Sequence, residues 1–168
     1  TGAGEIGTGG DGPDTGSQGA LASNLGAIAI GQDSVSSDLQ SVALGASSES
    51  SGAQSVAIGA EALASANQAI AVGDASQSTG FQSVAIGEGA NASASSAIAV
   101  GDGAVASAAE TISIGDNSDA SQANALAIGR QSISSGVDAV AIGPFAQSPG
   151  TAPVGIGPDS QATGAGRI

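Results

Sequence analysis

Residues 55–59 read Ser-Val-Ala-Ile-Gly, residues 83–87 repeat these five letters, and near-copies fall every 14 residues along the chain. In the three residues before the final glycine of the motif, a large aliphatic residue alternates with a tiny one. This period of two indicates a β-strand. The glycine itself occurs ten times at the same spacing without an insertion, at Gly31, Gly45, Gly59, Gly73, Gly87, Gly101, Gly115, Gly129, Gly143 and Gly157.

A second short strand is expected between successive glycines. The third and fifth residues after each glycine are always Ala or Ser, as in Ser34 and Ser36, whereas the residue between them varies from Val35 to Glu49. Ser or Thr follows in nearly every copy, often with Gly, which is typical of a turn. A 14-residue lap with two strands and two turns predicts an all-β fold, a β-solenoid whose coils pair at ~4.8 Å.

The alternation also suggests which side chains are buried. We expect the Val and Ile residues one and three places before each glycine to point inward, against the small residues of the second strand. The tiny residue between them would then face outward, in a row without charge, Gln or Asn. We interpret this row as a self-association face, unless turns cover it or Ala is merely tolerated there; its members are Ala29, Ala43, Ala57, Ala71, Ala85, Ala99, Ser113, Ala127 and Ala141.

The two ends of the chain depart from the regular pattern. Residues 1–19 are predicted to form a Gly-rich, loose leading segment, and residues 20–168 the array of coils. Ile168 falls where the first aliphatic residue of a strand belongs, so we expect the chain to stop within a coil. Since proline cannot donate to a central ladder, regularity should weaken in the last coils, which contain Pro144, Pro149, Pro153 and Pro158.

Composition excludes several classes of function. The formal net charge is −13 with only two basic residues, so neither nucleic acid nor an anionic membrane is expected as a partner. The chain lacks Cys, His and Lys, so the usual pairs of nucleophile and base cannot form. We therefore predict a protein that is not an enzyme and has no cofactor or metal site.

One row of acidic residues follows the repeat glycines. Asp74, Glu88, Asp102 and Asp116 occupy this place in four successive coils, and Arg130 comes next. In a solenoid these side chains would stack about 5 Å apart. They form either a solvated turn edge or a strip that collects cations or faces a basic patch of a ligand.

The motif has a family likeness. Residues 55–59 and 83–87, the variant at 41–45, and the 14-residue spacing closely resemble the head repeats of YadA-like trimeric autotransporter adhesins, over residues 20–168. The resemblance implies a left-handed parallel β-roll, a parallel homotrimer, and exposure on the outside of a Gram-negative outer membrane. It also implies binding to host extracellular-matrix proteins, cells or surfaces. The Asn that often opens the family motif is mostly replaced here, by Gln54, Gln68 and Gln82 or by other residues.

Two functions remain open at this stage. The first is an adhesin head that makes many weak contacts at once, so that avidity multiplies modest affinities. Its ligand would meet the variable outward positions, from Glu49 to Gln147, or the acidic row. The second is a structural spacer of a surface or phage tail fibre with no ligand of its own, which the near-identity of the coils favours. An ice-binding solenoid ranks last, because it calls for a regular outward row of Thr.

Overall fold

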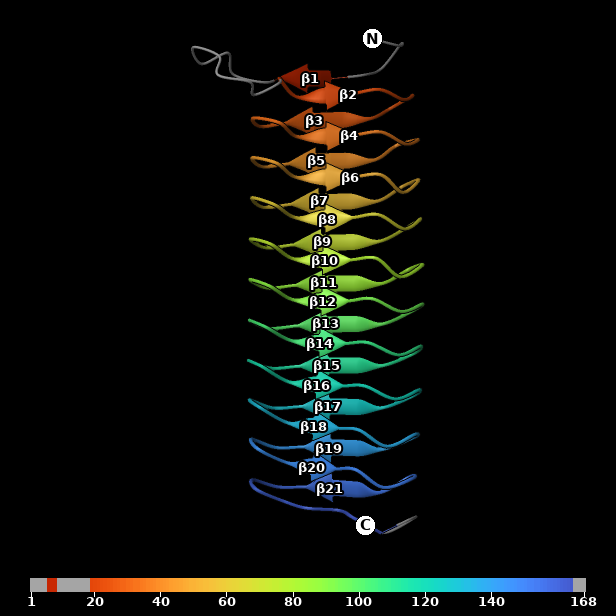
Figure 1. Cartoon of the computed structure of the whole chain (residues 1–168), viewed down its shortest axis with the longest axis vertical. Helices are drawn as coiled ribbons and strands as arrows, with labels where there is room; N and C mark the ends of the chain where they lie inside the picture. The colour runs from red at the N-terminus through yellow and green to blue at the C-terminus, as the bar shows by residue number, and fades with distance from the viewer. Residues whose placement is uncertain (1–5, 9–18, 165–168) are drawn as a thin grey trace.

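The computed structural model describes residues 6–8 and 19–164 and shows a rod of stacked coils with a turn at each side (Figure 1). Each coil contributes one strand to each of two sheets. The eleven-stranded sheet A contains β1 (Ile6–Thr8), β3 (Ile28–Ile30), β5 (Val42–Leu44), β7 (Val56–Ile58), β9 (Ile70–Val72), β11 (Val84–Ile86), β13 (Ile98–Val100), β15 (Ile112–Ile114), β17 (Leu126–Ile128), β19 (Val140–Ile142) and β21 (Val154–Ile156). The ten-stranded sheet B contains β2 (Leu21–Ala22), β4 (Val35–Ser36), β6 (Glu49–Ser50), β8 (Leu63–Ala64), β10 (Gln77–Ser78), β12 (Asn91–Ala92), β14 (Val105–Ala106), β16 (Asp119–Ala120), β18 (Ile133–Ser134) and β20 (Gln147–Ser148).

The register of both sheets confirms the 14-residue lap. All pairings are parallel, and from β2 and β3 onward each residue lies beside the one a lap later, as Val56 beside Ile70 in sheet A and Val35 beside Glu49 in sheet B. Ten laps at ~4.8 Å give a rod of roughly 50 Å. The predicted fold class, an all-β parallel β-solenoid with two short strands per coil, is confirmed.

The predicted faces of sheet A are reversed in the structure. The row that we expected on the outside is fully buried between the two sheets: Ala29, Ala43, Ala57, Ala71, Ala85, Ala99, Ser113, Ala127 and Ala141 each have a relative exposure of 0%. The aliphatic residues expected inside lie outside, and Ile58 and Ile86 are 38% and 41% exposed. The small residues therefore cannot form a self-association face, and that prediction is wrong.

The reason for the reversal is the width of the lumen. The prediction was right that the small residues three and five places after each glycine point inward, since Ser34, Ser36, Ala62 and Ala64 are buried. They meet other small residues rather than Val or Ile. The largest fully buried side chains are Thr111 and Pro153, followed by serines. Close packing of methyl and hydroxyl groups leaves no room for a larger side chain without strain.

In three coils, two buried hydroxyls face each other across the lumen. The fifth residue after a repeat glycine faces the fourth residue before the next one, and both are Ser in three coils. Their Oγ atoms lie 2.5–2.6 Å apart in Ser36–Ser41, Ser50–Ser55 and Ser78–Ser83. Other coils have two alanines at the same places, such as Ala64 and Ala69. Because a buried hydroxyl without a partner is costly, the coils with a single hydroxyl at these places direct it to a backbone carbonyl: Thr111 donates to Ala108 O, Ser134 to Ala139 O and Ser148 to Val140 O.

The repeat glycines form the predicted column, and the backbone requires them. Their φ angles range from +116° to +138°, a region that other residues rarely adopt. A Cβ atom added at Gly59 would lie 2.3 Å from the carbonyl oxygen of Gly73 in the next lap. Neither the backbone conformation nor the spacing of the coils therefore allows a side chain in this column.

The prolines leave sheet A in register, and the expected weakening is confined to sheet B of the last coil. Strands β19 and β21 pair in register. Pro144 follows a repeat glycine, where the carbonyl accepts the ladder bond, as in the 2.9 Å bond from Asp159 N to Pro144 O. Pro153 likewise serves as an acceptor, for the N–H of Val140. At these two places the lost N–H matters little. Pro149, in contrast, stands where the other coils donate to the next lap, as Ser135 N does to Ser148 O. Beyond it, within the described residues, sheet B keeps only the single bridge between Gln147 and Gln161.

The array also begins earlier than predicted. β1 pairs with β3 in parallel, with Ile6 beside Ile28, so residues 6–8 extend sheet A and are not a loose segment. The remainder of the predicted leading segment, residues 1–5 and 9–18, lies outside the described residues. So does Ile168, on which the expectation of a chain ending within a coil rests.

Candidate interaction surfaces

The outer face of sheet A is uniformly aliphatic. Each strand of sheet A from β3 to β21, that is each odd-numbered strand, carries two Val, Ile or Leu side chains on this face, and none of them is buried. The most exposed are Ile30 (44%), Ile86 (41%) and Ile156 (65%). Parallel sheets are normally covered on both faces, and a continuous exposed apolar surface of this kind marks an interface.

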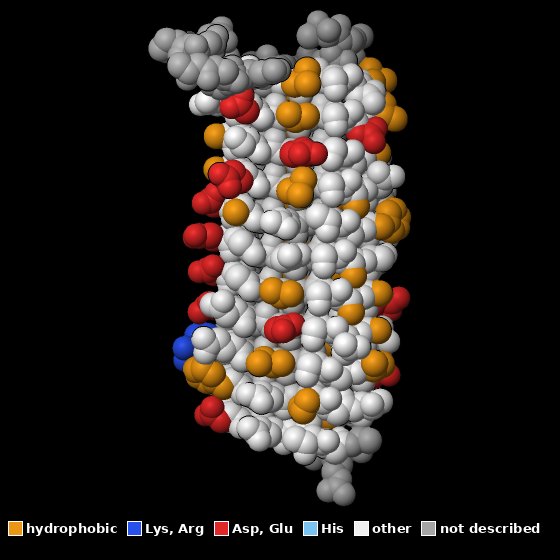
Figure 2. Space-filling model, in the orientation of Figure 1, with side chains coloured by type: hydrophobic (Ala, Val, Ile, Leu, Met, Phe, Trp, Pro, Cys, Tyr) orange, Lys and Arg blue, Asp and Glu red, His pale blue; other side chains and the backbone are white. Residues whose placement is uncertain are grey.

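An acidic edge borders sheet A on one side. We give this name to the residues that directly follow the repeat glycines from Asp74 to Arg130. Asp74, Glu88, Asp102 and Asp116 are all exposed and lie on successive laps, as predicted. Figure 2 shows acidic side chains stacked along one side of the rod, followed by a basic one and, nearer the lower end, a further acidic one. The Arg130 guanidinium lies over the Phe145 ring, 4.5 Å from its centroid.

The acidic edge has no preformed metal site. Within residues 6–8 and 19–164, no three residues of the types that bind metals come together. The side-chain amide of Asn117 donates to the carboxylate of Asp116. That the four acidic residues face a ligand or collect cations stays a prediction.

An amide edge borders sheet A on the other side. It consists of the residues five places before the repeat glycines, from Gln40 to Asp138. Its first four members form a hydrogen-bonded ladder in which each Nε2 donates to the Oε1 one lap earlier, at 3.3, 3.1 and 2.8 Å; they are Gln40, Gln54, Gln68 and Gln82. This ladder was not predicted from the sequence, although the recurrence of Gln at the coil period could have revealed it.

The outer face of sheet B is mixed. The variable row, predicted to face water, does lie outside, and the central column of Figure 2 shows hydrophobic, acidic and other side chains following one another. Asp119 belongs to this row; burial raises the pKa of its carboxyl, and its Oδ1 is buried without a hydrogen-bond partner. Beside it runs a row of hydroxyl residues, none of them buried: Ser23, Ser37, Ser51, Ser65, Thr79, Ser93, Ser107, Ser121 and Ser135.

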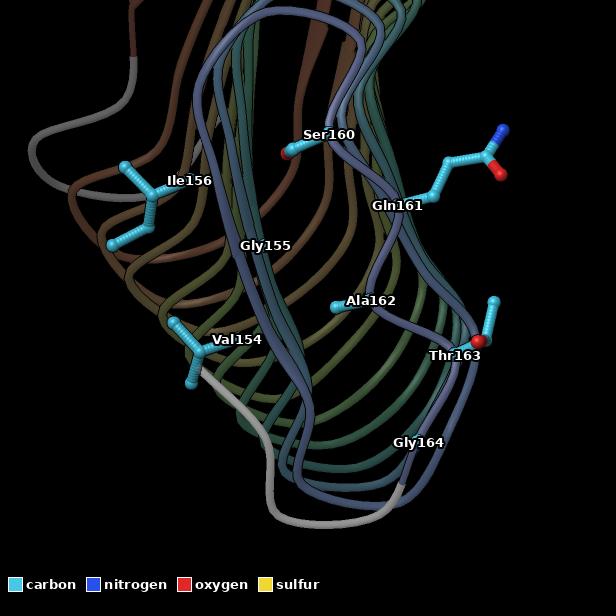
Figure 3. A pocket seen from close by; sticks show the side chains of 8 residues that line it. All are labelled: Val154, Gly155, Ile156, Ser160, Gln161, Ala162, Thr163 and Gly164. Carbon is cyan, nitrogen blue, oxygen red and sulfur yellow. The ribbon is translucent and has the colours of Figure 1, made fainter.

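A hollow of about 420 Å³ lies at the end of the lumen, at the last described coil. Figure 3 shows Ser160 and Ala162 pointing into it, whereas Gln161 and Thr163 point away. Gly155 widens this end, since a Cβ there would lie 2.9 Å from the Oγ of Ser148. The hollow therefore continues the lumen and brings together no group of catalytic side chains.

The repeat is recognised in known proteins. The chain matches the YadA head domain repeat at residues 22–48, 50–76, 78–104, 95–118, 106–132, 120–146 and 134–151, which is most of its length. The chain belongs to the YadA head family. The collagen-binding domain of the Yersinia adhesin YadA has a similar structure, with a TM-score of 0.59 and 26% sequence identity over 98% of this chain and 82% of that domain. No match was found among curated proteins.

Family membership confirms the predicted resemblance. A YadA head is the adhesive part of a bacterial cell-surface protein, so this chain is an adhesin head exposed at a cell surface. A role in adhesion favours a protein without catalytic activity. Within the described part of the chain, no helix is long and apolar enough to cross a membrane.

Proposed function

We propose that this chain is the head of a Gram-negative outer-membrane adhesin that attaches the cell to host extracellular matrix as a parallel homotrimer. The observation that supports the proposal best is the uninterrupted aliphatic face of sheet A in a chain that belongs to the YadA head family. The proposal of three copies rests on the family resemblance. The aliphatic face supplies the surface through which the copies associate.

The assembly follows from burial of sheet A. Covering apolar surface contributes ~25 cal/mol per Å², and each lap offers two partly exposed aliphatic side chains. The gain is repeated over ten laps, so it grows with the length of the rod. If each sheet A faces a common axis, rotation about that axis relates the copies and every lap meets its equivalents at one height.

The ligand would meet the surfaces that the assembly leaves exposed. The similar Yersinia domain binds collagen, and we propose collagen or a related matrix protein for this chain. The outer face of sheet B, with its variable row from Glu49 to Gln147, remains accessible on the outside, whereas the acidic edge borders the neighbouring chain. Repetition along the rod and among the copies would turn weak contacts into firm attachment.

Solid-phase binding of the assembled protein to collagen, fibronectin and laminin tests the proposal. We expect saturable binding to at least one of them, weakened when the assembly is dissociated into single chains. Binding to none of the three, by a protein that light scattering shows to be assembled, would favour the alternative of a structural spacer. That alternative draws on the near-identity of the laps.

A further inference from the structure

Arg130 and Asp138 lie on opposite borders of sheet A. Arg130 follows the strand β17 on the acidic edge, whereas Asp138 precedes β19 on the amide edge. The six residues from Asn124 to Arg130 span ~20 Å when extended, so the two edges of one chain are too far apart for a salt bridge. In a parallel cyclic assembly with sheet A facing the axis, however, the acidic edge of each chain meets the amide edge of the next.

The charges on the two edges are complementary at one height. Arg130 is the only Lys or Arg among the described residues, because Arg167 lies outside them. On the amide edge, the laps from Gln40 to Ser96 carry no charge, and carboxylates appear only at Glu110 and Asp138. These two residues lie one lap before and one lap after Asn124, which shares its lap with Arg130.

A hydrogen bond directs one of these carboxylates toward the lap that contains Arg130. The side-chain amide of Asn124 donates to Oδ1 of Asp138 over 2.9 Å, which holds the carboxylate beside the Asn124 lap. Arg130 and Asp138 are both exposed in the single chain. Stacking on Phe145 orients the guanidinium through its face and leaves its N–H groups available at the rim.

We propose that Arg130 forms an ion pair with Asp138 of the partner subunit at each junction between neighbouring chains. The inference rests on the proposed parallel assembly and adds the residues that join its edges. At lower-numbered laps the same junction places Asp74 and Glu88 level with Gln68 and Gln82 of the partner subunit, and amide N–H groups are suitable donors to carboxylates.

Cross-linking tests which edges meet. The chain contains no cysteine, so Arg130→Cys and Asp138→Cys introduce the only thiols. With a short bismaleimide, the double variant should yield covalently linked oligomers on a denaturing gel. Each single variant should run as a monomer on the same gel, because two acidic edges, or two amide edges, do not meet in this assembly. Linked dimers from a single variant, or no linkage in an assembled double variant, would overturn the inference.

A charge cycle tests the pair itself. Arg130→Gln should lower the midpoint of thermal dissociation, and Gln131→Glu, which makes the same change in net charge one residue away, should lower it less. In an Asp138→Asn background, Arg130→Gln should have little further effect, whereas loss of the Phe145 contact alone would act equally in both backgrounds. Exchanging the charges, Arg130→Glu with Asp138→Arg, should recover most of the midpoint lost by either change.

Light scattering separates failure of this inference from failure of the proposed assembly. A well-folded unmodified chain that stays monomeric would remove the assembly, and the ion pair with it. An intact oligomer whose Arg130→Gln and Gln131→Glu variants dissociate at equal midpoints, with equal shifts in both backgrounds, would remove the ion pair and leave the assembly standing.

Discussion

The outer faces of the two sheets differ although one repeat builds both. Sheet A shows only Val, Ile and Leu over ten laps, whereas the variable row of sheet B runs through Leu, Glu, Gln, Asn and Asp. Both faces have the same lap height and the same lumen behind them, so the fold does not account for the difference. A face that excludes every polar residue is selected for contact with protein, and a face that tolerates charge is selected for water or for varied ligands.

The strongest test of this difference places a charge on each face of the same lap. Ile86→Asp puts a carboxylate into the centre of the proposed interface, where an unpaired charge costs several kcal/mol. We expect the oligomer to dissociate. Asn91→Asp, on sheet B of the same lap, should leave it intact. Light scattering after size exclusion measures both, and dissociation by Asn91→Asp alone would mean that sheet B is the contact face.

The next test contrasts inside and outside on a single strand. Ala85 is fully buried in the lumen, whereas its neighbour Val84 is partly exposed. Ala85→Val adds two methyl groups to a close-packed space, and overpacking of this kind costs about 1–3 kcal/mol. Val84→Ile should change the stability by less than about 0.5 kcal/mol, as surface substitutions do. Chemical denaturation compares the two free energies of unfolding, preferably in the monomeric Ile86→Asp background.

These two residues also show how far the sequence could predict the fold. The spacing of the glycines predicted the lap, the parallel register and the glycine column correctly, since these depend on period alone. The side of the chain that Ala85 faces depends instead on the width of the lumen, and the assumption that large aliphatic residues form the core was wrong. The match of Ser50 with Ser55, and of Ala64 with Ala69, indicates that the two positions face each other in a narrow interior. This signal was present in the sequence.

The candidate surfaces were less predictable for a related reason. The acidic edge could be found because its residues recur at one place in the lap. The Arg130–Asp138 pairing could not, because it depends on which face of sheet A meets the partner subunit, and the row predicted to face outward is buried. Once the buried row is known, the two borders of the aliphatic face follow from the order of residues in the lap.

A third test concerns the turns that join the two faces. Gln131 adopts a φ of +55°, and glycine occupies the same place in the lap at Gly89, with a φ of +61°. Left-handed conformations cost a residue other than glycine about 1 kcal/mol, so Gln131→Gly should raise the free energy of unfolding by up to that amount. A matched Gln→Gly change at Gln147, in strand β20, should lower it instead. Denaturation midpoints of the two variants should therefore move in opposite directions.

The smallest expected effect lies on sheet B, at Asp119. Burial raises the pKa of this carboxyl in the folded chain, so the folded state holds its proton more tightly than the unfolded state does. Stability from this group is complete below the unfolded pKa, about 4, and is lost as the pH rises through the raised folded value. Asp119→Asn removes the titration and should make the chain more stable than the unmodified one above that window, with no difference below it.

Melting temperatures of the unmodified chain and of the Asp119→Asn variant, at a series of pH values, measure the effect of Asp119. Asp138→Asn, which changes an exposed carboxylate on the amide edge, serves as the control. Both comparisons are made in the monomeric Ile86→Asp background. A gain from Asp119→Asn that persisted at pH values below the unfolded pKa would mean that the side-chain shape, and not the buried charge, limits stability here. Sheet B would then resemble sheet A in demanding a particular side chain, and the contrast between the two faces would weaken.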